Sequence, residues 1–335
     1  MTPSAPRSRT VLVLGANGRF GLAAAQAFAA AGWRVLAHVR RDAAAGMPST
    51  AELVRAPLDA VGVALRGRAT PDVVVHGINP IYTRWEEEAL PAAHAAMDLA
   101  ERFGARFMLP GNVYNYGESM PERLDETTPQ RPSTAKGRIR VAMETELERR
   151  AAAGRLRSTV ITAGDFFGAG SGSWFDAVVA KSIAKGAIGY PGDPELSHAW
   201  AYLPDLARAF VAVASLDDLA PFERFAFAGH SLSGSEFLAA VERAAASLGL
   251  APARGWRRTS MPWPLLRVAG AVVPLWRELA RMSYLWRVAH ALDGTKLASR
   301  CPGLTPTPLA TALAGSLAAL GLAAGAERSP AHATG

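Results

Sequence analysis

The sequence predicts an α/β protein in which a doubly wound parallel sheet is followed by a smaller C-terminal α+β region. Two observations lead to this fold class. Short apolar runs alternate with helix-like segments through the first half of the chain, and a glycine-rich loop joins the first run to the first helix. The 335 residues are 50% hydrophobic and 19% charged, so the chain is able to bury a sizeable core.

The first strand, helix and second strand occupy the first forty residues. Thr10–Leu14 is an apolar run that ends at Gly15, which predicts a strand. Arg19–Ala31 is alanine-rich and ends at Gly32, which predicts a helix. Arg34–Val39 then predicts the second strand.

The same alternation continues to about residue 162. The expected strands are Asp72–His76, Ala105–Leu109 and Leu156–Thr162, and the expected helices are approximately Trp85–Phe103 and Thr134–Ala153. Strands separated by helices imply right-handed crossovers and a parallel sheet covered on both faces.

After Gly164 the pattern changes to Gly/Ser-rich loops and proline-containing segments. We expect a first domain at residues 1–165, to which residues 200–222 return, and a second region at residues 166–335 that is mainly helical after residue 230. The elements expected here are helices at Leu203–Ala214, Ser235–Ala246 and Leu309–Leu322, a strand at Arg224–Phe227, and a frayed tail after Ala326.

The loop Gly15–Gly21 (GANGRFG) carries three glycines, each three residues from the next. The first allows a tight turn, the second allows backbone to approach a pyrophosphate, and the third allows helix and strand to pack closely. Because a strand precedes this loop and a helix follows it, the sequence predicts a Rossmann-type dinucleotide site. The expected cofactor contacts in the loop are Gly15, Asn17, Gly18, Arg19, Phe20 and Gly21.

The end of the second strand selects between the two nicotinamide cofactors. An acidic residue there binds the ribose hydroxyls of NAD, whereas arginine accommodates the 2′-phosphate of NADP. This chain has Arg40 and Arg41 at that place, which favours NADP over NAD.

The chain resembles the extended and atypical short-chain dehydrogenase/reductase superfamily, its NAD-dependent epimerase/dehydratase branch in particular, over about residues 10–320. The resemblance rests on the glycine loop and three further segments: Asp72–Asn79 (DVVVHGIN), Asn112–Gly117 (NVYNYG) and Ala201–Ala209 (AYLPDLARA). It implies that residues 1–165 bind the cofactor and residues 166–335 bind substrate. It also implies cofactor contacts at Leu58, Gly77, Ile78 and Asn79, and Pro57 stands where a family aspartate often touches the adenine.

The catalytic residues of the family are replaced in this chain. Members usually have Ser/Thr after the fifth strand and a Tyr-x-x-x-Lys on the next helix, where Asn112, Lys136 and Arg140 stand here. Asn112 can donate to a carbonyl oxygen, and Arg140 can hold ribose hydroxyls or phosphate. Lys136 replaces the tyrosine as acid/base if burial and the neighbouring Arg140 favour its neutral amine. Tyr114 and Tyr116, just past the strand end, are the other proton-donor candidates.

Four residues are expected to border the substrate. Tyr82 follows the expected strand Asp72–His76, and Asp165 lies in the loop after Leu156–Thr162, which in the family closes over nicotinamide. His198 and Trp200 alternate with Tyr202, so an extended segment would turn all three to one side. The same aromatic residues are equally compatible with a packed core.

Residues 254–300 hold nine Lys/Arg against Glu278 and Asp293, and so carry the whole net charge of +7. Four of the eight tryptophans lie in the same segment. Such a segment suits an acidic substrate, anionic lipid or nucleic acid, or it is a helical subdomain with packed tryptophans and solvated arginines. Nucleic-acid binding is the least expected of these.

The sequence shows no features of an exported, membrane-spanning or disulfide-bonded protein, or of a metalloprotein or hydrolase. The N-terminus lacks an apolar signal segment, no run is long enough to span a membrane, and Cys301 alone makes no disulfide, so we expect a cytoplasmic protein. No spacing suggests a metal site or a hydrolase elbow. The oligomeric state is left open, a homodimer included.

The leading hypothesis is an NAD(P)-dependent oxidoreductase acting on a small molecule. It would transfer hydride to or from a carbonyl, an imine or an activated double bond, with Asn112 as oxyanion donor, Arg140 on the cofactor and Lys136 as proton donor. Two alternatives stay open. The missing tyrosine suggests a non-catalytic NADP-sensing regulatory protein, and the fold also suits a sugar-nucleotide epimerase or dehydratase, whose diphosphate the basic segment would receive.

Overall fold

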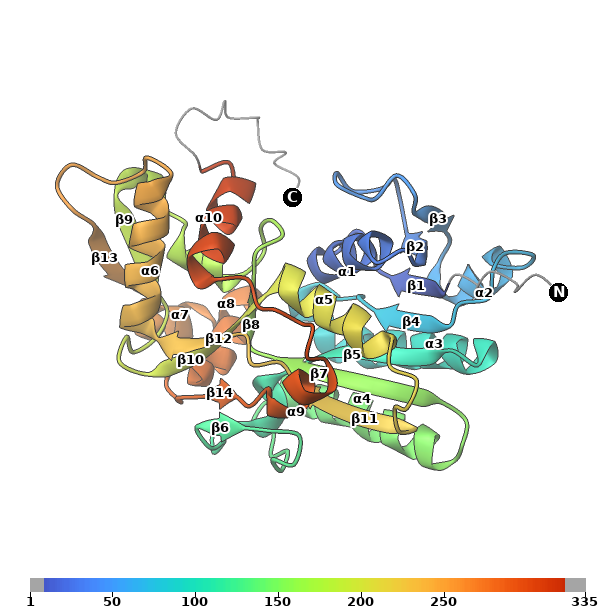
Figure 1. Cartoon of the computed structure of the whole chain (residues 1–335). Coiled ribbons are helices and arrows are strands. Elements are labelled where there is room, and N and C mark those ends of the chain that lie inside the picture. Colours follow the sequence, from blue (N-terminus) through green and yellow to red (C-terminus); the bar gives the residue numbers. More distant parts are fainter. Residues whose placement is uncertain (1–8, 323–335) are drawn as a thin grey trace.

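The computed structural model describes residues 9–322 and contains a seven-stranded parallel sheet (Figure 1). Its strands, in spatial order, are β11 (Phe222–Ala226), β7 (Arg157–Ala163), β5 (Arg106–Asn112), β4 (Val73–His76), β1 (Thr10–Leu14), β2 (Arg34–Val39) and β3 (Glu52–Arg55). The predicted fold class is confirmed. From β1 the strands are added outward to β2 and β3, and then from β4 onward on the other side of β1, so the order of strands reverses between β1 and β4. In such folds ligands bind at the carboxyl ends of the strands beside that point.

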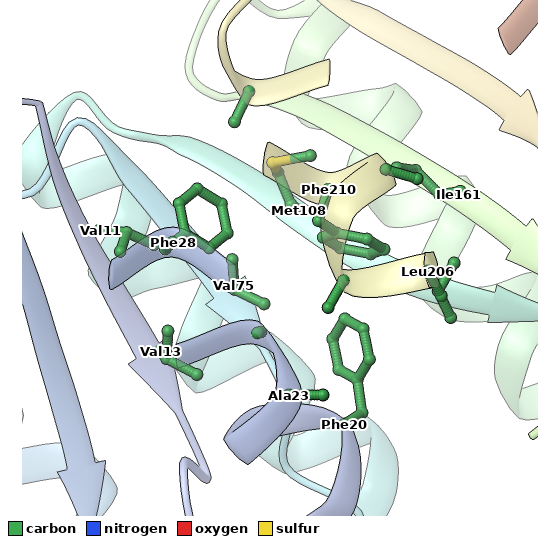
Figure 2. Packing of buried hydrophobic residues seen from close by; sticks show 14 of the residues in the cluster. Val11, Val13, Phe20, Ala23, Phe28, Val75, Met108, Ile161, Leu206 and Phe210 are labelled. Atoms are coloured by element: carbon green, nitrogen blue, oxygen red, sulfur yellow. The ribbon is translucent and has the colours of Figure 1, made fainter. Parts of the chain in front are cut away.

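Helices cover both faces of this sheet because its strands are apolar on both sides. Helices α1 (Arg19–Ala30) and α5 (Leu203–Ala214) pack on one face, and α2 (Val61–Ala64), α3 (Trp85–Phe103) and α4 (Ala135–Ala152) on the other (Figure 1). Successive residues of β1 point to opposite faces: Val11 and Val13 enter the core under α1 and α5, while Leu12 and Leu14 enter the core over α3. Figure 2 shows the first of these cores, with Phe20 of α1 against Phe210 of α5.

The rest of the chain forms a second region beside the carboxyl ends of the sheet. It contains three small sheets: β8 (Asp165–Phe167), β10 (Ser197–Tyr202) and β12 (His230–Ser233); β9 (Ala187–Tyr190) with β13 (Arg257–Ser260); and β6 (Arg123–Leu124) with β14 (Ala291–Leu292). Its helices are α6 (Gly234–Ser247), α7 (Trp263–Ala269), α8 (Pro274–Arg281), α9 (Thr295–Arg300) and α10 (Leu309–Ala319). Short 3-10 turns include η1 (Leu58–Ala60), η2 (Tyr82–Arg84), η3 (Val113–Tyr116), η5 (Ile183–Lys185) and η6 (Met282–Trp286), and Phe175–Val179 is a π-helical turn.

The elements predicted from periodicity are present with small shifts at their ends. The strand expected at Ala105–Leu109 runs from Arg106 to Asn112, and the helix expected at Leu309–Leu322 ends at Ala319. The small strands of the second region were not predicted, because each has two to six residues and its partner is distant in sequence. The frayed tail expected after Ala326, and the N-terminal residues before Arg9, lie outside the described residues.

Helix α5 and strand β11 join the first part of the chain again. Helix α5 packs along α1, and β11 pairs with β7, with Phe222 opposite Ser158. Within residues 9–322 no helix is long and apolar enough to cross a membrane.

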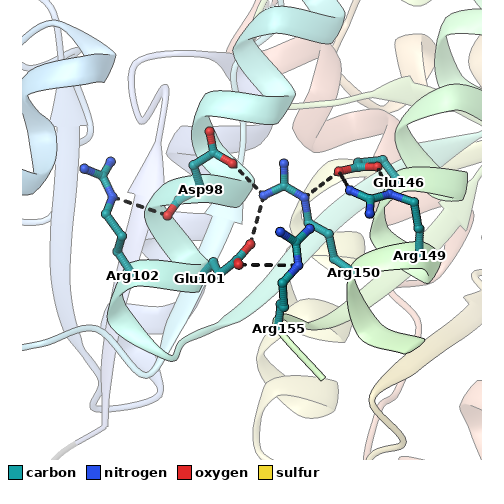
Figure 3. A network of polar contacts seen from close by, with 7 residues as sticks. All are labelled: Asp98, Glu101, Arg102, Glu146, Arg149, Arg150 and Arg155. Carbon is teal, nitrogen blue, oxygen red and sulfur yellow. Dashed lines mark hydrogen bonds and ion pairs between the residues drawn. The ribbon is translucent and has the colours of Figure 1, made fainter. Parts of the chain in front are cut away.

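An ion-pair network ties α3 to α4 (Figure 3). The buried guanidinium of Arg150 bridges Asp98 at 2.6 Å, Glu101 at 3.2 Å and Glu146 at 2.7 Å. One cation therefore contacts three carboxylates from two helices, two of which also pair with Arg149 or Arg155, and this network fixes the relative position of the helices.

Replacing Arg150 by methionine is expected to lower the free energy of unfolding by about 2–3 kcal/mol, because three neighbouring carboxylates lose their shared cation. Urea unfolding measures this effect. The control is Arg149→Met, which removes an exposed guanidinium bonded to the same Glu146 and is expected to cost less than about 1 kcal/mol. Equal losses in the two variants would contradict the assignment.

Candidate functional site

The glycine loop between β1 and α1 is packed backbone to backbone. Gly15 has a φ of +70°, and a Cβ on it would lie 2.9 Å from the carbonyl oxygen of Gly77, in the loop after β4. A Cβ on Gly21 would run into the carbonyl of Gly15. Side chains are therefore excluded where two loops meet at the carboxyl end of the sheet, as close approach of a pyrophosphate requires.

The N-terminus of α1 has no acidic or capping side chain of its own. Its N-cap is Gly18, and the first turn contains no carboxylate. The oriented N–H groups of that turn therefore carry an uncompensated partial positive charge, which suits an anion. Together with the glycine packing, this end of α1 fits the diphosphate of a dinucleotide.

Arg19, the first residue of α1, crosses from this loop to the second region. Its guanidinium donates to the carbonyl of Gly168 at 2.8 Å and to that of Gly172 at 3.3 Å. Its Nε is buried and has no hydrogen-bond partner within residues 9–322, and burial lowers the pKa of the guanidinium. Arg19 thus holds the segment after β8 against the glycine loop and retains one unused donor.

The end of β2 presents the two arginines that the sequence singles out. Arg40 and Arg41 are exposed, and Asn17 of the glycine loop bonds the carbonyl of Asp42 at 2.7 Å and the N–H of Ala44 at 2.9 Å. The glycine loop and the loop after β2 are therefore held together. Buried His38 of β2 contacts the segment after β3: its Nε2 lies 2.9 Å from the carbonyl of Ala56, and burial lowers the pKa of its imidazole.

Three of the residues expected to contact the cofactor have side chains that pack wholly or partly against the protein. Phe20 is buried between Phe166 and Phe210, so only its backbone faces the glycine loop. Leu58 is half-buried in η1, and Ile78 packs against the core below α3. Asn79 accepts a hydrogen bond from the indole of Trp85 at 3.1 Å.

Asn112 is the last residue of β5, and Tyr114 lies in the turn η3 that follows, next to Tyr82. The side-chain oxygen of Asn112 accepts from the N–H of Tyr114 at 3.1 Å, so its amide N–H₂ is left to donate elsewhere. The hydroxyls of Tyr82 and Tyr114 share a hydrogen bond. Burial, and then the Asp165 carboxylate, raise the pKa of Tyr114, while Arg140 lowers it in part. Tyr114 accordingly has a protonated hydroxyl, with both a cation and a carboxylate among its neighbours.

Arg140 projects from α4 toward the same place. Its guanidinium donates to the carbonyl of Pro110 at 3.1 Å and lies 4.9 Å from the centre of the Trp85 ring. Its Nε is buried without a hydrogen-bond partner, and so is Nδ1 of His76, whose pKa burial and Arg140 lower to about 3. Two unused polar atoms therefore lie beside the carboxyl ends of β4 and β5.

Lys136 is buried and bound to a carboxylate from α8. Its ammonium donates to Glu278 at 2.6 Å and lies 4.3 Å from the centre of the Tyr82 ring. The other oxygen of Glu278 accepts from Arg281 at 2.7 Å. The nearest charged partner of Lys136 is thus Glu278, not Arg140, which was the neighbour expected to favour a neutral amine.

Asp165 and His198 form a pair on the substrate side. Nε2 of His198 lies 2.8 Å from the Asp165 carboxylate, and its ring stacks on Trp286 with centres 4.1 Å apart. His290 lies 4.6 Å from His198, and its Nε2 and the indole N–H of Trp286 are buried without partners. The expected alternation in β10 is present, and Trp200 is fully buried against Phe237.

Tyr116 faces the core instead of this cluster. It is buried beneath η3 and hydrogen-bonded to Thr162, with Glu144 nearby. The structure thus brings together Asn112, Tyr114, Tyr82, Lys136, Arg140, Asp165 and His198. Tyr116 and Trp200 are buried behind them, and the Trp200 ring lies 5.1 Å from that of His198.

The sequence interpretation missed the residues that α8, η6 and the loop after η6 contribute, namely Glu278, Tyr284, Trp286 and His290. One signal for them was present. Glu278 is the only acidic residue between Arg254 and Leu292, a stretch with seven arginines, and a lone acid in a basic segment suggests a specific partner. Among residues 9–322, no group of His, Cys, Asp or Glu side chains is arranged to hold a metal ion.

A model of the NAD dependent epimerase/dehydratase family matches residues 11–225. Comparison with curated proteins found no match.

Solved structures of the same fold cover nearly the whole chain. A putative epimerase from Burkholderia cenocepacia J2315 is 20% identical, with a TM-score of 0.69, over 94% of this chain and 99% of that one. MoeE5 in complex with UDP-glucuronic acid and NAD is 18% identical, with a TM-score of 0.70, over 93% and 98%. UDP-glucose 4-epimerase from Thermotoga maritima, bound to UDP-glucose, is 16% identical, with a TM-score of 0.70, over 92% and 98%. At these identities the likeness concerns the fold.

Proposed function

This chain belongs to the NAD-dependent epimerase/dehydratase family, and we propose that it is an NADP-dependent oxidoreductase in which Tyr114 is the proton donor. The reaction is hydride transfer to or from a carbonyl, an imine or an activated double bond of a small molecule bound by residues 166–335. The observation that carries the proposal is the placement of Tyr114 at the carboxyl end of β5, where its N–H donates to the Asn112 side chain at 3.1 Å and where Tyr82, Arg140 and Asp165 are its neighbours.

Each neighbouring residue has a defined part in carbonyl reduction. Bound NADPH supplies the hydride that reaches the carbonyl carbon. The amide of Asn112 donates to the carbonyl oxygen, and Tyr114 gives that oxygen its proton. Tyr82, bonded to Tyr114, and the Arg140 cation stabilise the tyrosinate that remains. Oxidation runs through the same steps in reverse.

Lys136 is assigned a positioning part in this scheme. Its ammonium is bound to Glu278 and lies against the Tyr82 ring, so it orients the tyrosine that bonds Tyr114. Asp165, paired with His198, is assigned to a hydroxyl or N–H of the substrate, because its second oxygen is free to accept a hydrogen bond.

The test is a panel of aldehydes, ketones, imines and enones incubated with the protein and NADPH, with NADPH absorbance followed over time. Substrate-dependent oxidation through many turnovers is expected. The panel includes UDP-glucose, since sugar nucleotides occupy the sites of related folds. NADPH binding by calorimetry without turnover of any compound would replace this proposal with the cofactor-sensing alternative.

The preference for NADP is tested separately at Arg40. Arg40→Ser is expected to weaken NADPH binding about 10–100-fold, because one charge-assisted contact to the 2′-phosphate is lost, and to leave NADH binding unchanged. Calorimetry with both cofactors measures the effect. Arg66→Ser, which removes an exposed arginine elsewhere, is the control. Equal loss for NADPH and NADH would remove the assignment of Arg40 to the phosphate.

A further inference from the structure

Helices α7 and α8 carry a cluster of exposed apolar side chains. Their exposed fractions are 64% for Leu265, 76% for Val268, 81% for Val272, 45% for Leu275 and 39% for Trp276. Of the seven large apolar residues exposed in the described part of the chain, five belong to this short segment. We call these five residues the hairpin patch. Such clusters on a protein surface mark an interaction site.

Helices α7 and α8 pack against each other as a helical hairpin. This hairpin is anchored to the rest of the protein, so the patch is not part of a loose loop. Gly270 lies against the backbone of Arg277, which lets the two helices pack directly. The indole of Trp263 donates to the carbonyl of Pro191 at 2.5 Å, and Leu266 faces inward. Glu278 on α8 faces inward to Lys136. The inner side of the hairpin is therefore committed to the protein, and the outer side displays the patch.

The charged side chains of the segment that carries the patch are mostly basic. Between Arg254 and Leu292 the only acidic residue is Glu278, which is buried, whereas the arginines are exposed. Arg267 and Arg277 lie within the hairpin itself, and Arg281 ends α8. Arg281 is paired with Glu278 at 2.7 Å and Glu86 at 3.7 Å, whereas Arg267 and Arg277 form no ion pair within residues 9–322. The outer side of the hairpin thus combines aliphatic side chains, a half-exposed tryptophan and two unpaired arginines.

We propose that the hairpin patch docks on an anionic lipid bilayer. Leu, Val and Trp side chains flanked by arginines are the composition that inserts at the headgroup boundary, with the cations on lipid phosphates. A nucleic acid offers no matching apolar surface for Leu265, Val268 and Val272. A second copy of this chain would bring arginine against arginine, because the surface would pair with itself.

The test is co-sedimentation of the full chain with vesicles. Binding is expected to vesicles of phosphatidylcholine and phosphatidylglycerol in equal parts, and to be at least about tenfold weaker to phosphatidylcholine alone. It is expected to weaken with added salt, because the lipid charge is screened. Equal binding to the two vesicle types, or no binding to either, overturns the proposal.

Two variants separate the apolar and the charged contributions. Val268→Asp with Val272→Asp is expected to lower binding at least about tenfold, and Arg267→Ser with Arg277→Ser by about 25-fold, or fivefold for each arginine. All four side chains are exposed, so circular dichroism is expected to stay unchanged. The control is Val63→Asp on α2, where a valine that is 58% exposed lies outside the patch. Loss of binding in this control would show that the patch is not the docking surface.

Light scattering of the protein without vesicles tests whether a second copy of this chain covers the patch instead of a bilayer. A mass of one chain is expected for the docking-competent form. A mass of two chains that Val268→Asp converts to one would overturn the proposal, because the patch would then be covered by a second copy. No cofactor is added in these measurements, so their outcome is independent of whether the site turns over a substrate.

Discussion

Tyr114→Phe is expected to lower kcat for carbonyl reduction by about 10²–10⁴-fold while leaving NADPH affinity within about twofold. The size of the effect is that of a general acid removed from its reacting oxygen. Affinity is spared because phenylalanine keeps the ring and loses only the hydroxyl bonded to Tyr82. Steady-state kinetics with calorimetry separates the two quantities.

The matched control is Tyr116→Phe, two residues away on the same turn. Its hydroxyl is bonded to Thr162 inside the protein and does not reach the Tyr82 side. We expect this variant to keep its kcat within about threefold. Comparable losses in both variants would mean that the turn η3, and not the Tyr114 hydroxyl, is what the reaction requires.

Lys136→Met tests the other proton-donor assignment. If Lys136 is a positioning residue, its loss is expected to reduce kcat less than Tyr114→Phe does, and Lys136→Arg is expected to restore part of the activity, because arginine can still bind Glu278. Abolished turnover in Lys136→Met together with full turnover in Tyr114→Phe would make Lys136 the acid.

The second large effect is a loss of stability as pH falls from about 6.5 toward 4. Burial lowers the pKa of His76 to about 3 and that of His290 to about 4, whereas histidine in an unfolded chain titrates near 6.5. Between these values the unfolded chain binds protons that the folded protein does not, so the free energy of unfolding decreases as pH decreases. Each histidine contributes about 1.4 kcal/mol per pH unit.

Urea unfolding at pH 7, 6, 5 and 4.5 measures this loss. Over that window each histidine is expected to remove about 2–3 kcal/mol. Carboxylates with lowered pKa values, such as Glu146 and Asp293, both near 2, add their effect mainly below the window. His290→Gln is expected to reduce the slope by less than half, whatever its stability at pH 7, because burial also lowers the pKa values of His38 and His230. A flat profile in the unmodified protein would contradict the burial of both imidazoles as neutral groups.

Much of the cofactor end of the site was predictable because its determinants are local. The loop Gly15–Gly21 lies between a strand and a helix that periodicity alone identifies, and Arg40 follows a strand with the predicted bounds. The substrate end was predictable only in part. Asp165 and His198 were singled out separately, and the 2.8 Å contact between them was not, since 33 residues separate them.

Sequence alone determined the α/β class and the glycine packing at α1, because strand alternation, helix periodicity and turn chemistry act within a few residues. The tertiary structure decided which charged and polar side chains lie next to each other. Lys136 meets Glu278 across 142 positions of chain, and Tyr114 rather than Tyr116 faces Tyr82. Such pairings depend on how distant elements pack, and no short-range pattern encodes them.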